Sequence, residues 1–106
     1  MIDNDKSFAL EADLTRHVKA YLQDQSDIFF WKASDRFNKG VSDIIACVSG
    51  VFVAIELKAT KGKPSPHQEL FIKQVIKRGG IGGTCYTIAQ VQELVSAARR
   101  KYIKLQ

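Results

Sequence analysis

The sequence contains no long apolar run and few of the residues that build disulfide or zinc frameworks. No stretch approaches the roughly 18 apolar residues of a membrane span, and the first residues do not resemble a signal peptide, so we expect no membrane segment. Both cysteines, Cys47 and Cys85, lie in apolar strand-like stretches. We expect them to be buried free thiols in a reducing cytosol, with a disulfide between them as the alternative. Two cysteines and two scattered histidines are too few for a zinc site.

The sequence also lacks internal repeats, linkers and low-complexity segments, so we expect a single domain over residues 1–106 with one sizeable core. Residues 79–83 read Gly-Gly-Ile-Gly-Gly, but they follow an expected helix and precede an expected strand. This order is the reverse of a phosphate-binding loop, and no Lys-Ser or Lys-Thr pair follows the glycines. We therefore interpret the glycines as a flexible connector.

Positive charge is in excess, with a net charge of +5. A basic surface favours polyanions, chiefly nucleic acid. A merely solvated surface would explain any one basic cluster, but it explains less well why basic residues flank the acidic pair described below. The clusters comprise Lys58, Lys61 and Lys63, then Lys73, Lys77 and Arg78, and finally Arg99, Arg100, Lys101 and Lys104.

Hydrophobic periodicity and turn residues predict an α/β fold with the order α-β-β-β-α-β-α. Ser7 and Asn4 are candidate N-caps of the first helix, and Ser65 with Gln68 forms a candidate capping box for the second. The last strand should join the sheet in parallel, which gives a mixed sheet flanked by helices. The expected helices span residues 7–25, 66–78 and 90–101, the expected strands span 28–33 and 84–88, and a hairpin spans 43–58.

Helical spacing also predicts which side chains face the core. These positions are Leu10, Leu14, Val18, Tyr21 and Leu22 in the first helix, Leu70, Phe71, Val75 and Ile76 in the second, and Val91, Leu94, Val95 and Ala98 in the last.

The hairpin directs two carboxylates at each other. If Ser49-Gly50 is a two-residue turn, the register places Asp43 directly opposite Glu56, with Cβ atoms roughly 4.5–5.5 Å apart. A three-residue loop would put the two on opposite faces. Opposed like charges are destabilising unless a cation lies between them. Lys58 lies two residues beyond Glu56 and should point the same way.

Two further residues could join this site. Glu11 falls on the apolar stripe of the first helix, where a carboxylate is costly unless it is paired or bound to metal, although it could instead lie solvated at the edge of the stripe. Gln68 could orient the lysine or a water molecule, or it could serve only in the capping box.

Such a cluster suits Mg²⁺ or Mn²⁺, which prefer oxygen ligands. A bound ion polarises a phosphoryl oxygen and supplies hydroxide near neutral pH. We expect Asp43 and Glu56 to hold the ion, with Glu11 as a further ligand. Lys58 would orient the water or stabilise the developing charge.

These residues resemble the motifs of the PD-(D/E)XK nuclease superfamily, and in particular its VRR-NUC branch, the virus-type replication-repair nucleases. The matching elements, in order and over nearly the whole chain, are Glu11, Gly40-Val41-Ser42-Asp43, Glu56-Leu57-Lys58 and Gly62-Lys63-Pro64-Ser65-Pro66-His67-Gln68. The resemblance implies a restriction-endonuclease-like core and a divalent metal bound by Glu11, Asp43, Glu56 and the backbone carbonyl of Leu57. It also implies a homodimer akin to Holliday junction resolvases.

The sequence as a whole predicts a metal-dependent, structure-selective DNA endonuclease in the cytoplasm of a bacterial or phage-infected cell. Its substrate would be branched DNA such as a Holliday junction. Alternatives are a non-catalytic DNA-binding module with this fold, or a nuclease for other DNA or RNA. Basic loops would contact phosphates on either side of the metal, through Arg36, Lys39, Lys61 and Lys63. Candidate residues for the dimer interface are Phe29 or Trp31, Phe37, Tyr102 and Ile103.

Overall fold

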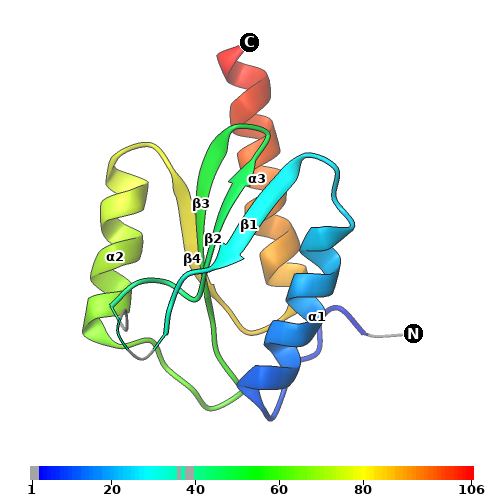
Figure 1. The fold of residues 1–106 in the computed structure, drawn as a ribbon, viewed down its shortest axis with the longest axis vertical. Coiled ribbons are helices and arrows are strands. Elements are labelled where there is room, and N and C mark those ends of the chain that lie inside the picture. The colour runs from blue at the N-terminus through cyan, green and yellow to red at the C-terminus, as the bar shows by residue number, and fades with distance from the viewer. Residues whose placement is uncertain (1–2, 36, 38–39) are drawn as a thin grey trace.

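The hydrophobic patterns of the chain correspond to three helices and four strands in the computed structural model, which describes residues 3–35, 37 and 40–106. The predicted order, α-β-β-β-α-β-α, is confirmed (Figure 1). In chain order the elements are α1 (Glu11–Gln23), β1 (Ile28–Lys32), β2 (Ile44–Val48), β3 (Val51–Leu57), α2 (Pro66–Lys77), β4 (Ile81–Cys85) and α3 (Ile88–Leu105).

The strands form one mixed sheet in the order β1-β2-β3-β4. β1, β2 and β3 are antiparallel neighbours, and β4 pairs with β3 in parallel, as predicted. Ser49 and Gly50 form the turn between β2 and β3 with positive φ angles of 50° and 85°, which suits a two-residue hairpin. Val48 consequently pairs with Val51, and Ile44 with Ile55, which is the register expected from the sequence.

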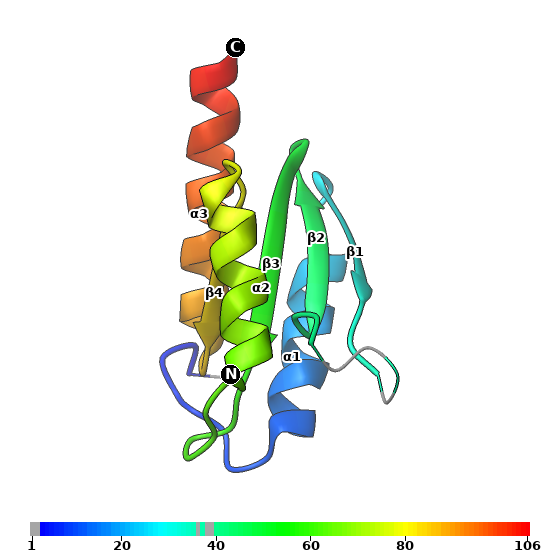
Figure 2. The same ribbon diagram turned by 90° about the vertical axis from the view of Figure 1, so that its left-hand side faces the viewer.

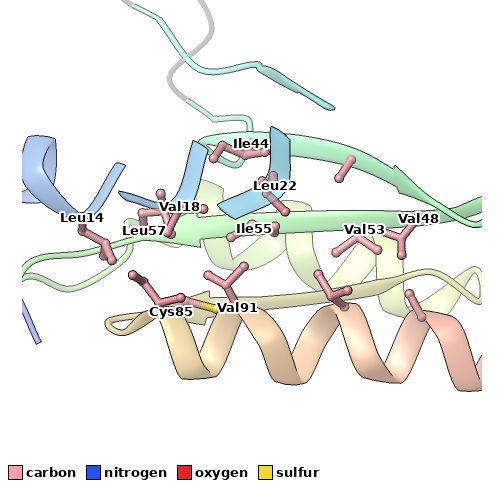
Figure 3. Packing of buried hydrophobic residues seen from close by; sticks show 14 of the residues in the cluster. Leu14, Val18, Leu22, Ile44, Val48, Val53, Ile55, Leu57, Cys85 and Val91 are labelled. Atoms are coloured by element: carbon pink, nitrogen blue, oxygen red, sulfur yellow. The ribbon is translucent and has the colours of Figure 1, made fainter. Parts of the chain in front are cut away.

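Helices cover both faces of the sheet. α1 and α3 lie on one face, and α2 lies on the other, over β3 and β4 (Figures 1 and 2). The main core forms under α1 and α3, where Leu14, Val18 and Leu22 pack towards the sheet (Figure 3). β3 is central and buried on both faces over most of its length, so its sequence is almost continuously apolar.

The first helix begins later than predicted. Its first residue is Glu11, and its N-cap is Leu10, not Ser7 or Asn4. Leu10 is 62% exposed and does not face the core as we had predicted. Glu11 lies in the first turn with its side chain 46% exposed, so it takes the second of its two predicted positions, at the edge of the stripe, and does not face the core.

The second part of the glycine-rich connector, from Ile81 to Gly83, belongs to a strand. β4 begins at Ile81, three residues before the predicted start, and ends at Cys85. A Cβ atom at Gly82 would lie 3.2 Å from Ile72 Cγ2 and 3.3 Å from the Ala54 carbonyl oxygen. Glycine therefore lets α2 pack closely against the sheet, which local propensity does not reveal.

The last helix is longer than predicted at both ends. It begins at Ile88, where the hydroxyl of Thr87 accepts a hydrogen bond from the Gln90 N–H (3.1 Å), and it continues to Leu105. The predicted core positions Val91, Val95 and Ala98 are buried, and Leu94 is partly buried. Within the part of the chain that the structure describes, no helix has both the length and the apolar character to cross a bilayer.

α2 buries a narrower stripe than predicted. Phe71 and Val75 are partly buried against the sheet, but Leu70 and Ile76 are 53% and 51% exposed, and Ile72 is buried in their place. The stripe is narrow because α2 covers only the β3 and β4 side of its face.

The same arrangement explains the two thiols. Both cysteines are free, as expected, and Cys85 is buried. Cys47 is exposed, contrary to our prediction, because it lies on the part of the α2 face nearer to β1.

Candidate functional site

The two carboxylates of the hairpin meet at one end of the sheet. Asp43 directly precedes β2, and its backbone N–H donates a hydrogen bond to Glu56 Oε1 at 3.1 Å. The backbone N–H of Leu57 donates to Asp43 Oδ2 at 2.7 Å. These bonds continue the β2–β3 register beyond Ile44 and Ile55, so the opposed geometry follows from the two-residue turn.

Glu56 is wholly buried. Burial, together with the nearby charge of Asp43, raises the pKa of its carboxyl to about 7, although the ammonium of Lys58 acts in the opposite direction. The only polar partner of its Oε2 atom among the described residues is the ammonium of Lys58, 3.1 Å away. A buried carboxylate that depends on a single cationic partner is costly in a purely structural role, because desolvation can exceed the attraction of the pair.

Lys58 lies between two carboxylates. Its Nζ is 3.7 Å from Glu11 Oε1 as well as 3.1 Å from Glu56 Oε2, and its side chain is only 18% exposed. Burial lowers the pKa of Lys58, but Glu56, Glu11 and Asp43 together outweigh that effect, so the net shift is upward. The ammonium is thus charged, and it joins the N-terminus of α1 to the end of β3.

The sequence did not predict two further residues near Asp43: Ser34, which contacts its Oδ1 atom, and Lys32, which contacts Ser34. Ser34 Oγ donates a hydrogen bond to Asp43 Oδ1 at 2.9 Å. Lys32 Nζ donates to the Ser34 carbonyl and hydroxyl oxygens at 3.3 and 3.4 Å. The pairing of Lys32 with Ile44 brings the end of β1 beside Asp43. A prediction that β1 pairs with β2 in antiparallel would therefore have placed Lys32 and Ser34 near the site.

Gln68 forms the capping box that was one of its two predicted roles. The Ser65 N–H donates to Gln68 Oε1 at 2.9 Å, and the Gln68 N–H donates to Ser65 Oγ at 3.2 Å. Gln68 nevertheless lines the same cavity of about 450 Å³ as Glu11, Lys32 and Asp43. The structure therefore places Gln68 at the candidate site, and its predicted role in orienting Lys58 or a water molecule stays a prediction.

Two of the four predicted phosphate contacts lie among the described residues. Lys61 and Lys63 are exposed on the loop between β3 and α2. The Gly62 carbonyl between them accepts a hydrogen bond from the Tyr86 hydroxyl at 2.9 Å, which fixes this loop against the start of α3. Arg36 and Lys39 lie outside the described residues.

The donor set fits a hard divalent cation. The Asp43 carboxylate is held by hydrogen bonds to both of its oxygens beside Glu56, and Glu56 Oε2 faces only a cationic group among the described residues. Glu11 contacts the pair only through Lys58. Among the described residues, no group of three acidic, histidine or cysteine side chains is arranged to hold a metal ion. The N–H of Leu57, bonded to Asp43, places the backbone of that residue beside the pair.

Comparison with known proteins supports the fold. No family model and no curated protein matches the chain. A solved structure described as a VRR_NUC domain is similar to it, with a TM-score of 0.66 and 24% sequence identity over 81% of this chain and 94% of that chain. The chain therefore has the nuclease-like α/β fold that the motifs predicted.

Proposed function

We propose that this protein is a divalent-metal-dependent endonuclease that hydrolyses phosphodiester bonds in DNA. The observation that carries the proposal is the opposed Asp43–Glu56 pair at one end of the sheet in a VRR_NUC-like fold, with Glu56 buried, Asp43 partly buried and Lys58 beside them. Two carboxylates held this close repel one another, and the ammonium of Lys58 offsets only part of their negative charge, which favours a further cationic ligand.

The residues have separate roles in this proposal. Asp43 and Glu56 hold Mg²⁺ or Mn²⁺, with Glu11 and the Leu57 carbonyl as further ligands. The metal, when bound, polarises the phosphoryl group and lowers the pKa of a water molecule.

Lys58 stabilises the negative charge that develops on the phosphate, and Gln68 orients Lys58 or the attacking water. Ser34 and the Leu57 N–H hold the Asp43 carboxylate in place from both oxygens.

The substrate that we propose is branched DNA, cut by a homodimer. The net charge of +5 and the exposed Lys61 and Lys63 beside the site favour a polyanion. A four-way junction contains two equivalent strands, and a two-fold dimer presents two sites with the same symmetry. The end of α3, where Tyr102 and Ile103 are 41% and 68% exposed, offers apolar surface for the second copy.

Cleavage assays test the proposal. A labelled four-way junction, a linear duplex of the same sequence and the matching RNA would be incubated with Mg²⁺ or Mn²⁺. We expect the wild type to cut the junction fastest and Asp43→Ala to be inactive. Lys58→Ala should reduce the rate while retaining DNA affinity, whereas Lys61→Ala should weaken affinity and flatten its salt dependence.

Each other outcome has a distinct meaning. DNA binding without cleavage in either metal would support the non-catalytic DNA-binding module. Preferential cutting of RNA or linear duplex would overturn the branched-DNA substrate while retaining the nuclease.

A further inference from the structure

The sheet face that carries the candidate site is covered by α2 over β3 and β4, and exposed aromatic residues lie on its β1 side. Phe29 and Trp31 project from this face of β1, with 69% and 48% of their surfaces exposed. Their ring centroids are 5.7 Å apart and the rings are tilted by 43°, so they form a contiguous aromatic surface. Large aromatic residues so exposed and so close together indicate a binding surface.

This surface is aligned with the site. Trp31 pairs with Ile45, and Asp43 lies two residues before Ile45, so Trp31 and Asp43 share one face. Strand geometry places their Cα atoms about 8 Å apart, and those of Phe29 and Asp43 about 14 Å apart. The rings therefore lie within a few nucleotides of a phosphate bound at Asp43.

We infer that Phe29 and Trp31 form a stacking platform for unpaired bases of the DNA strand whose backbone enters the site. The inference rests on the proposed nuclease function and specifies its substrate class. Base–aromatic stacking is independent of sequence and combines with cationic contacts to the backbone. Lys32, the next residue after Trp31, lines the cavity of the site and supplies such a cation.

Unpaired bases fit this surface better than a second copy of the chain. A second copy seated on Phe29 and Trp31 would cover a surface about 8 Å from Asp43 and obstruct the approach of a phosphodiester to the carboxylates. The end of α3 offers apolar surface without this obstruction. The enzyme should therefore prefer strands with unpaired nucleotides beside the cut, such as flaps, single-stranded ends and open junction centres, over continuous duplex.

The single tryptophan of the chain provides a direct test. In metal-free buffer with EDTA, where no cleavage can occur, the protein would be titrated with oligo(dT) of about 12 nucleotides and, separately, with a DNA hairpin of equal charge whose strands are joined by a non-nucleotide linker, so that it has no unpaired bases. We expect oligo(dT) to quench Trp31 fluorescence and the hairpin to change it little, because only unpaired bases can stack on the ring.

Variants then separate stacking from charge. Phe29→Ala should weaken oligo(dT) binding by about 5- to 150-fold while leaving hairpin binding within about twofold, since each stacked base contributes about 1–3 kcal/mol. Phe29→Leu, which keeps the apolar area, should behave similarly. Phe52→Ala is the matched control: Phe52 is 46% exposed on the same face but lines the groove beside Phe71, so oligo(dT) affinity should not change.

The platform is overturned if oligo(dT) leaves the fluorescence unchanged, or if Phe29→Ala weakens oligo(dT) and hairpin binding equally. It is also overturned if Phe29→Ala or Trp31→Leu halves the mass measured by sedimentation, because the face would then be an interface between copies. Cleavage by the wild type with no fluorescence response would reject the platform alone. A fluorescence response without cleavage in any metal would reject the nuclease alone.

Discussion

Glu56 combines total burial with a neighbouring carboxylate, and this combination determines how the stability of the metal-free protein depends on pH. Because the pKa of Glu56 is raised to about 7 from a reference of 4.5, the folded state binds more protons than the unfolded state between those values. Stability should therefore fall as pH rises from about 4.5 to 7, and no further loss from this group should occur above that range. The size of the effect is on the order of 3 kcal/mol.

Glu56→Gln should remove this pH dependence. The amide keeps an oxygen for the Asp43 N–H and carries no charge, so in EDTA the variant should be as stable as the wild type near pH 5 and more stable at pH 8. Urea unfolding across this range would measure the difference. Glu69→Gln, an exposed carboxylate in the first turn of α2, is the control. A variant that is less stable than the wild type at pH 8 would contradict the opposed-pair geometry.

At the scale of elements, Asp27 joins three parts of the fold. Arg99 of α3 donates to both of its carboxylate oxygens at 2.9 and 2.8 Å, and Ser49 of the hairpin turn donates to Oδ2 at 2.7 Å. The hydrogen bonds from Arg99 and then Ser49 hold the pKa of Asp27 far below its usual range. Because a depressed carboxyl pKa stabilises the fold above the unfolded value, this contribution is present at neutral pH and is lost in acid.

Asp27→Asn should therefore destabilise the protein by about 1 kcal/mol at pH 7, a value that allows for solvent screening of the partly exposed pair. The difference from the wild type should shrink as the pH is lowered below about 4. Urea unfolding at pH 7 and pH 3 would measure it, with Asp24→Asn at the exposed end of α1 as the control. An equal difference at both pH values would show that the ion pair is not its cause.

The elements that the sequence predicted well are those specified by neighbouring residues. The Ser49-Gly50 turn and the alternating strands around it define the hairpin locally, so the register of Asp43 and Glu56 follows from sequence. β4 was misplaced because Gly82 is unfavourable in a strand by propensity and is accommodated there by tertiary packing against Ile72.

The sequence likewise predicted the site residues that lie on one local element and missed those that tertiary pairing brings to the site. Asp43, Glu56 and Lys58 share one hairpin, whereas Ser34 reaches Asp43 only because β1 pairs with β2. The metal roles of these residues stay predictions, as do the contacts of Arg36 and Lys39.

At the scale of the whole molecule, α3 extends beyond the sheet that it packs against. Its last turns protrude past the hairpin (Figures 1 and 2), and Ile103 and Leu105 are 68% and 75% exposed there. Short helical segments gain most of their stability from packing, so the exposed Ile103 and Leu105 on this unsupported helix end favour contact with another surface, although the basic Lys104 lies between them. Two such ends related by a two-fold axis would pack as a helix pair and leave both sites open.

Sedimentation at micromolar concentration should therefore give about twice the 11.9 kDa mass of one chain. Ile103→Glu with Leu105→Glu should give the monomer, because a second copy cannot bury these charges. Leu70→Glu, at an exposed leucine on α2, should leave the mass unchanged. A wild-type mass near 11.9 kDa would reject paired incision, since one metal site cuts one strand. If the double variant is still a dimer, the dimer interface lies elsewhere. Phe37, which is 85% exposed, is then the remaining candidate that leaves the stacking platform uncovered.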